Sequence, residues 1–322
     1  MARPRFGAPR AALVAALWGA AAAARGAPPT AATVDVDVLV YAANPAGLAA
    51  GITAAGGVAR RHSVLVMEPL RMIGGMAAAG GVGLMNAEQD VYRQGLGGVW
   101  CGLNGAQLGN ASRPNCFAEP HVGERSFWLM ANATANMSVV LGCVLTGATA
   151  PGGRLASATF DCSEGGGSQQ VVVTAAVFVD ASYDGDLMVA SGAADYTSGR
   201  EAASVYNESL AGTLDIEQPN ESFGALPWID PHDASGALLP GVSADPMPAN
   251  GTADDRLMAF SYFICAAPVD SGNAVPWAAP PGYNPADFEL LRRVIAAYSE
   301  MKREFTLADF SEYQVRAPAP VL

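Results

Sequence analysis

The sequence predicts an α/β protein: a three-layer, Rossmann-like dinucleotide-binding domain with a β-meander, followed by a less regular region. Two stretches carry this prediction. Residues 34–68 read as strand, tight turn, helix, strand and acid, in the order and roughly the length of a dinucleotide-binding βαβ unit. Residues 136–180 hold short β-rich runs separated by glycine turns, and they end in the apolar run 176–180. This pattern is typical of a meander that returns to a parallel sheet.

The turn of the βαβ unit, residues 42–47, follows the β-branched run 36–41 and consists of small residues. A bound pyrophosphate requires small side chains here, because backbone N–H groups and a helix N-terminus must approach it. The usual glycine pattern keeps only its third glycine, Gly47, while Ala42 and Asn44 replace the first two. Ala42 is compatible with the turn if its φ stays negative. Alone, the motif fits a βαβ turn of another α/β protein equally well.

The predicted helix 48–58 leads to a second buried strand, 63–67, which is followed by Glu68. An acid in this place accepts hydrogen bonds from both ribose hydroxyls of an adenosine. Two glycine clusters follow, one at Gly74 and Gly75 and one within residues 94–99. Both are interpreted as loops whose backbone approaches a flat or phosphorylated ligand, with ordinary loop formation as the alternative.

Further elements follow from the same patterns. The sequence predicts helices over residues 122–135, 187–192 and 286–305, and strands over residues 136–147, 154–162, 169–174 and 176–180. The last helix is amphipathic, which favours packing on the domain over membrane binding.

Residues 177–201 read VFVDASYDGDLMVASGAADYTSGRE, and residues 206–212 read YNESLAG. These stretches are similar to the FAD-dependent oxidoreductase family, whose members carry D-A-T-Y-E-G-D-L, then G-R-E, then Y-x-E-S-x-A-G. The order of the predicted elements resembles the flavin domain of glutathione-reductase-type flavoproteins. The resemblance extends over residues 34–298 and is most specific between residues 180 and 212.

The resemblance implies FAD, held noncovalently. The turn would take the pyrophosphate and Glu68 the adenosine ribose. Gly74, Gly75 and Met76 would line the path of the phosphates and ribityl chain, and the backbone of Val144 would contact the adenine. Asp180 and Ala181 would end the returning strand beside the cofactor. The implied cofactor-binding residues are Ala42, Asn44, Pro45, Ala46, Gly47, Glu68, Gly74, Gly75, Met76, Val144, Asp180 and Ala181.

Flavin chemistry needs few acids and bases from the protein, because the cofactor carries the electrons. His121 is a candidate catalytic base near the flavin, with a structural histidine at the start of the following helix as the alternative. Asp184 and Asp186 fit paired acids, a calcium site or a helix N-cap. Arg200 and Glu201 fit either a site for a substrate carboxylate or an ion pair with each other. We expect no metal site.

The predicted organisation has three parts: a signal peptide in residues 1–26, the N-terminal part of an FAD-binding domain in residues 34–186, and a substrate or cap region in residues 187–322. The resemblance also implies a final flavin-domain strand with a Gly-Asp pair. No such strand is predicted after residue 298, so we expect the chain to be truncated. Glycine at position 42 is the other family feature that is replaced.

The N-terminus combines Arg3, Arg5 and Arg10 with an apolar run of 14 residues, 11–24, and small residues after it. This is a secretory signal pattern, with an organelle transit peptide as the runner-up. Six N-x-S/T sequons favour the secretory route, and they begin at Asn110, Asn132, Asn136, Asn207, Asn220 and Asn250. Five cysteines fit an oxidising compartment with one or two disulfides, leaving at least one cysteine outside them.

The net charge of −12 and the absence of a basic patch after the N-terminus argue against nucleic acid as a partner. No later run is long and apolar enough to span a membrane. The sequence therefore predicts a secreted or luminal FAD-dependent oxidoreductase that transfers hydride from an unidentified small organic substrate to flavin. One alternative is a catalytically silent, glycosylated relative that acts as a binding protein, and another is a flavin- or NAD-linked enzyme of a different subclass.

Overall fold

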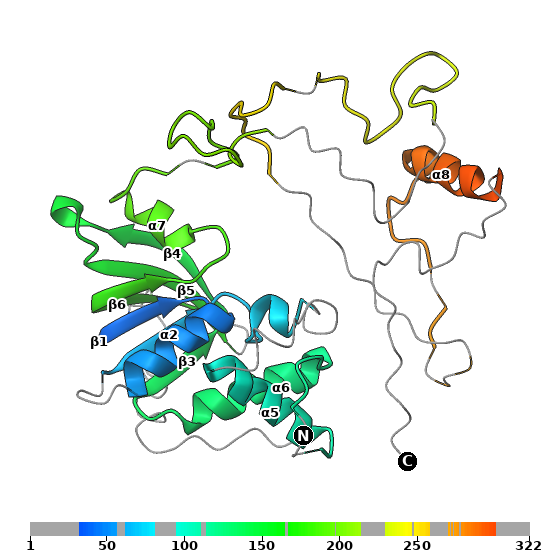
Figure 1. Cartoon of the computed structure of the whole chain (residues 1–322). Coiled ribbons are helices and arrows are strands. Elements are labelled where there is room, and N and C mark those ends of the chain that lie inside the picture. The colour runs from blue at the N-terminus through cyan, green and yellow to red at the C-terminus, as the bar shows by residue number, and fades with distance from the viewer. Residues whose placement is uncertain are drawn as a thin grey trace. The chain divides into compact units, whose positions relative to one another are not determined.

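One six-stranded sheet organises the first half of the chain (Figure 1). In this computed structural model, the residues described are 32–56, 62–80, 95–110, 114–164, 167–196, 198–213, 229–246, 248–257, 270, 272, 274–276 and 278–300. The predicted signal peptide and the chain after residue 300 lie outside these residues. The elements are β1 (Ala32–Tyr41), α2 (Pro45–Gly56), β2 (Val64–Glu68), η1 (Gly75–Ala77), α5 (Gly95–Gln107), α6 (Pro120–Ala133), β3 (Met137–Leu141), β4 (Cys143–Thr149), η2 (Pro151–Gly153), β5 (Ser157–Glu164), β6 (Gly167–Asp180), α7 (Asp186–Ser191), η3 (Pro285–Phe288) and α8 (Glu289–Glu300).

The strands lie in the order β3-β2-β1-β6-β5-β4. The pairs β3–β2, β2–β1 and β1–β6 are parallel, whereas β6–β5 and β5–β4 are antiparallel. All five residues of β2 are buried, as expected of a parallel strand that is covered on both faces. The predicted α/β class, with a parallel sheet and a β-meander, is therefore confirmed.

Alternate residues of β1 divide the core into two clusters. Val38 and Val40 pack in the cluster that contains Leu48 of α2 and Phe127 of α6. Leu39 and Tyr41 pack in the cluster that contains Phe160 of the meander. Helices therefore cover one face of the parallel strands and the meander covers the other, which gives the three layers that the sequence predicts.

Three predicted elements differ from the structure. The predicted strand 136–147 is two strands, because Gly142 has a φ of +69° and redirects the chain from the parallel sheet (β3) into the meander (β4). The predicted strands 169–174 and 176–180 are one strand, β6, which pairs with β5 over residues 167–174 and with β1 over residues 171–180. The glycine cluster at residues 94–99 is not a loop, because helix α5 begins at Gly95.

The chain divides into two units, Met1–Tyr196 and Thr197–Leu322. The described part of the second unit is irregular, with two isolated β-bridges, Arg200–Asp254 and His232–Leu238, and helix α8. The side chain of Asn284 caps the 3₁₀ turn that leads into α8 by accepting a hydrogen bond from the Ala286 N–H. Within the described residues, no helix has the length and apolarity needed to cross a membrane.

Candidate functional site

Three segments meet where the parallel strands β1, β2 and β6 end. The Ala42 N–H donates to the Met67 carbonyl over 2.8 Å, and the Ala181 N–H donates to the Tyr41 carbonyl over 2.9 Å. The Gly74 N–H donates to the Ala43 carbonyl over 2.8 Å. The turn 42–47, the segment 68–76 and the segment 180–183 are therefore one connected structure at the carboxyl edge of the sheet. Ligands of open α/β sheets bind at this edge.

The turn closes tightly onto the start of helix α2. A Cβ atom at Gly47 would overlap the Ala42 carbonyl oxygen, so the third glycine of the motif is required sterically. Asn44 is buried, and its Oδ1 accepts a hydrogen bond from the Gly47 N–H at 2.9 Å, while its Nδ2 donates to the Ala181 carbonyl. The Asn44 side chain is thus an N-cap that also binds the end of β6.

The Asn44 cap determines which backbone N–H groups in the first turn of α2 remain available to an anion. Pro45 has no N–H, and the Gly47 N–H is taken by Asn44. Ala46 lies between them and is exposed. Within the described chain, Ala46 is therefore the first-turn residue whose N–H is offered to a phosphate oxygen at the positive end of α2.

Ala42 does not have the negative φ on which its compatibility with the turn depends. Its φ is +75°, in the left-handed region that glycine adopts freely. An alanine there raises the free energy of the fold by about 1 kcal/mol relative to glycine. The family has glycine at this position because the turn needs a left-handed φ there. Alanine in its place strains the turn.

Glu68 lies at the end of β2 with 5% of its surface exposed. Its Oε2 accepts a hydrogen bond from the Ala43 N–H at 2.6 Å and its Oε1 accepts one from the Leu70 N–H at 2.8 Å. Burial raises the pKa of this carboxyl, against the lowering effect of the two amides. Each oxygen keeps a second lone pair, which is the acceptor capacity that two ribose hydroxyls need.

The predicted glycine loop is a close-packed kink. Gly74 and Gly75 have φ values of +96° and +49°. A Cβ at Gly74 would lie 2.5 Å from the Phe127 ring, and one at Gly75 would lie 2.7 Å from the Asn44 Cβ and overlap the Tyr183 hydroxyl. The following Met76 N–H donates to the Tyr183 hydroxyl over 2.8 Å. Tyr183 was not among the residues predicted for the site, although it lies within the D-A-S-Y-D-G-D stretch that carried the resemblance.

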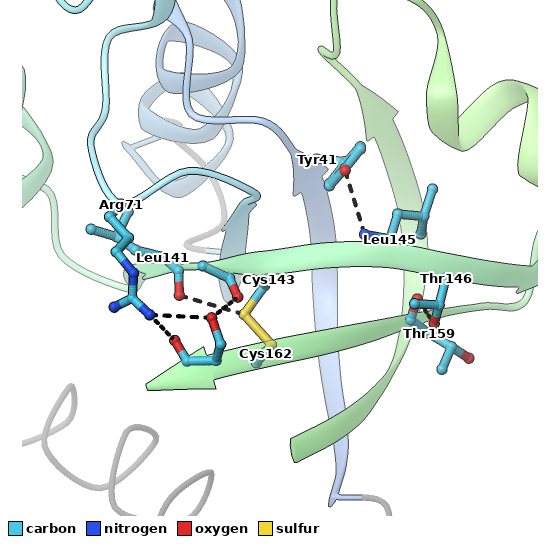
Figure 2. The surroundings of a disulfide bond; sticks show 10 residues. Tyr41, Arg71, Leu141, Cys143, Leu145, Thr146, Thr159 and Cys162 are labelled. Atoms are coloured by element: carbon cyan, nitrogen blue, oxygen red, sulfur yellow. Dashed lines mark hydrogen bonds between the residues drawn. A yellow bond between two sulfur atoms is a disulfide. The ribbon is translucent and has the colours of Figure 1, made fainter. Parts of the chain in front are cut away.

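The predicted adenine contact, Val144, directly follows Cys143 in β4. Cys143 forms a disulfide with Cys162 that joins the first two meander strands (Figure 2). Cys143 and Cys162 are paired across β4 and β5 and are both buried. The Arg71 guanidinium donates to the carbonyl and hydroxyl of Ser163, each over 3.2 Å. The segment after Glu68 is thereby tied to the start of the meander, and Val144 is 52% exposed there.

The remaining predicted site residues differ in what they contact. The Asp180 carboxylate accepts hydrogen bonds from the Ser182 N–H and hydroxyl and from the Met188 N–H, so it holds the start of α7. His121 is 76% exposed at the start of α6, with its Nδ1 3.4 Å from the Glu119 carboxylate. These contacts place His121 at a helix terminus.

The acids around α7 do not form a metal centre. Burial and the neighbouring charges of Asp184 and Asp180 raise the pKa of Asp186. The described part of the chain contains no group of three or more His, Cys, Asp or Glu side chains arranged to hold a metal ion.

Arg200 pairs with Asp254 and not with Glu201. Its Nε and Nη2 donate to the two carboxylate oxygens of Asp254 over 3.0 and 2.7 Å. This bidentate pair contradicts one of the two alternatives drawn from the sequence, an ion pair between Arg200 and Glu201. An open hollow of about 680 Å³ in the second unit brings the two family stretches together, since it is lined by Arg200, Glu201, Asn207, Glu208, Ser209, Leu210, Ala211 and Gly212.

No curated protein sequence matches the chain significantly. Solved structures resemble it faintly. L-proline dehydrogenase from P. horikoshii is 15% identical over 47% of this chain and 23% of its own, with a TM-score of 0.30. The myxobacterial chondrochloren halogenase CndH is 15% identical over 46% of this chain and 37% of its own, with a TM-score of 0.32. The 3-ketosteroid-Δ4-(5α)-dehydrogenase from Rhodococcus jostii RHA1 is 13% identical over 49% of this chain and 47% of its own, with a TM-score of 0.30.

The chain spans less than half of the length of each of these structures, and likenesses this weak do not bear on its function. A family model matches much more of it. Residues 37–318 match the model described as FAD dependent oxidoreductase. The match covers the turn, Glu68, the glycine loop and most of the second unit. The chain therefore belongs to the FAD-dependent oxidoreductase family, whose cofactor is FAD.

Proposed function

We propose that this chain is a secretory-pathway oxidoreductase that binds FAD at the carboxyl edge of its parallel sheet and oxidises a small organic substrate. The observation that carries the proposal is the convergence of the turn 42–47, Glu68 and the Gly74–Gly75 kink on that edge. When bound, FAD supplies the two-electron chemistry by accepting a hydride from the substrate, and a second acceptor then reoxidises it.

The residues present fit this cofactor. Gly47 and Gly75 have no Cβ, and a Cβ at either position would collide with neighbouring atoms. The turn 42–47 and the Gly74–Met76 loop can therefore lie close together. Glu68 carries two spare acceptor sites in a buried position, which match the two ribose hydroxyls. The Ala46 N–H and the positive end of α2 suit a phosphate charge.

Each of these groups binds or orients and none transfers a proton. Glu68 would hold the ribose, the start of α2 would offset the pyrophosphate charge, and the two glycines would allow the backbone to approach the chain of the cofactor. The substrate or cap region predicted from the sequence, residues 187–322, would supply contacts to the substrate. His121 stays the candidate base of the sequence prediction, and its exposed position beside Glu119 supports a helix-terminal role equally well.

Disulfides and sequons support the secretory part of the proposal. Cys101 pairs with Cys116 and Cys143 with Cys162, and all four side chains are buried. Such bridges persist in oxidising compartments. Five of the six sequon asparagines lie within the described residues, and every one of these five is exposed, as a glycan requires: Asn110, Asn132, Asn136, Asn207 and Asn250.

The proposal is tested by titrating the purified chain with FAD and following flavin fluorescence. We expect Glu68→Gln to weaken FAD binding about 10- to 100-fold, because a carboxylate that accepts two hydroxyl hydrogen bonds is lost. Asp35→Asn is the control, since it removes an exposed carboxylate near the opposite end of β1 and should leave the affinity unchanged. Equal loss in both variants, or no FAD binding by a folded parent chain, would contradict the proposed site.

A second candidate is a glycosylated binding protein that has lost oxidoreductase activity. The observation that favours it is the strained Ala42, at +75°, in the turn that receives the pyrophosphate. The two candidates differ in one spectrum. An oxidoreductase bleaches its bound flavin when its substrate is added without air, whereas the binding protein holds no flavin or keeps it oxidised throughout a substrate screen.

A further inference from the structure

Tyr183 makes a connection that no motif reveals. Its hydroxyl accepts the hydrogen bond of the Met76 N–H at 2.8 Å, although the two residues lie 107 positions apart. The side chain is 57% exposed, so it lies at the surface of the site and not in the core. An exposed tyrosine usually hydrogen-bonds to water, and here it is directed instead at the backbone of the glycine loop.

Hydrogen bonds anchor the chain on both sides of Tyr183. Before it, Ala181 is bound through its N–H to Tyr41 and through its carbonyl to the Asn44 amide. After it, the Asp180 carboxylate holds the Met188 N–H, and the Ser182 hydroxyl accepts from the Asp186 N–H. The backbone that carries Tyr183 is therefore anchored to the turn and to α7, and it cannot follow the glycine loop if that loop moves.

The loop on the other side needs such a support. Gly74 and Gly75 both adopt left-handed φ values, and glycine gives up more conformational freedom than any other residue when it is fixed. The hydroxyl of Tyr183 lies directly against Gly75, where even a methyl group would collide with it. The hydroxyl thus restricts the loop sterically as well as through the Met76 hydrogen bond.

We propose that Tyr183 is a positioning residue that latches the Gly74–Met76 loop in the conformation that receives the phosphates and ribityl chain of FAD. This inference rests on the proposed function, because it assigns the loop to that cofactor. It concerns the phosphate and ribityl end alone, since Glu68 and Val144 serve the adenosine end. It adds Tyr183 to the cofactor-binding residues, although the sequence patterns that predicted those residues do not include it.

Binding measurements on Tyr183→Phe test the latch, because the change deletes the hydroxyl and keeps the ring. We expect FAD to bind about 3- to 10-fold more weakly, which is the effect of one lost hydrogen bond. Adenosine, which has no phosphate and contacts the adenosine end alone, should bind with unchanged affinity. Tyr196→Phe is the matched control, as Tyr196 is an exposed tyrosine of the same unit, and it should bind both ligands like the parent.

Two results would overturn the latch: FAD affinity equal to that of the parent, or equal losses for FAD and adenosine, which would indicate a general loosening of the fold. A parent chain that binds no FAD would refute the proposed function, and a measurement without ligand then decides the latch. Hydrogen exchange at the Met76 amide, followed by NMR with nitrogen-labelled methionine, should be at least about threefold faster in Tyr183→Phe than in Tyr196→Phe. Equal rates would refute the latch.

Discussion

Ala42 shows how one methyl group can matter at a cofactor turn. Its φ of +75° suits glycine, and the motif has alanine there. We predict that Ala42→Gly raises the free energy of unfolding by about 0.5–1 kcal/mol, because the relieved left-handed strain exceeds the flexibility that glycine adds to the unfolded chain. Urea denaturation measures the change.

Ala43 provides the matched control for this prediction. It is the next residue, it is fully buried and its φ is not positive. Ala43→Gly should therefore destabilise the chain, because it loses a buried methyl group and gains only flexibility. Destabilisation by both substitutions would show that the left-handed conformation of residue 42 carries no strain.

Glu68 gives the site a pH dependence. Burial raises the pKa of its carboxyl, so in the free chain the protonated form persists to higher pH than in an ordinary glutamate. Ribose hydroxyls donate to the ionised form and lower this pKa in the complex. We therefore predict that FAD affinity falls as the pH is lowered from neutral into the acidic range, as the carboxylate of the free chain takes up its proton.

The measurement is the dissociation constant of FAD across this pH range in the parent and in Glu68→Gln. The variant has no carboxyl to titrate at residue 68, so its affinity should change less over the same range. Parallel curves for the two proteins would place the titration on another group.

At the scale of elements, the Cys143–Cys162 disulfide joins the meander strands β4 and β5, and Arg71 connects the segment after Glu68 to Ser163 of β5 (Figure 2). The bridge spans 19 positions. We predict that replacing both cysteines by alanine lowers the free energy of unfolding by about 2–4 kcal/mol, because the unfolded chain regains the freedom of that loop. It should also weaken AMP binding, because the strand that carries Val144 loses its tie to β5.

The second disulfide is the comparison for this element. Cys101 and Cys116 close a loop of similar length, separated by 15 positions, beside the stacked rings of Trp100 and Phe127. Replacing that pair by alanine should destabilise the fold to a similar extent and leave AMP binding unchanged. Thermal denaturation and AMP titration separate the two effects. If the two double variants bind AMP alike, the Cys143–Cys162 disulfide does not contribute specifically to AMP binding.

The elements also show what a sequence can and cannot predict. The βαβ unit was predictable because β1 and β2 are buried apolar runs and Gly47 is sterically required. Helix α5 was not, because its five glycines oppose a helix and tertiary contacts of Trp100 override them. The Tyr183–Met76 bond was not predictable either, because it joins segments 107 positions apart.

At the scale of the whole molecule, the proposed function includes passage through the secretory pathway. Five exposed sequon asparagines and two buried disulfides are the features that support this proposal. We predict that the chain expressed with its own N-terminus in a eukaryotic host is secreted, and that an N-glycosidase lowers its apparent mass. Retention in the cell without glycans would contradict the secretory route, and it would not bear on the proposed flavin site.

The central claim is that the edge formed by the turn, Glu68 and the glycine loop holds FAD. Its most direct test is the visible absorption spectrum of the chain, purified from a secretory host, incubated with FAD and then separated from free FAD by gel filtration. We expect flavin absorption bands that elute with the folded protein. A folded parent chain that elutes without flavin would contradict the claim.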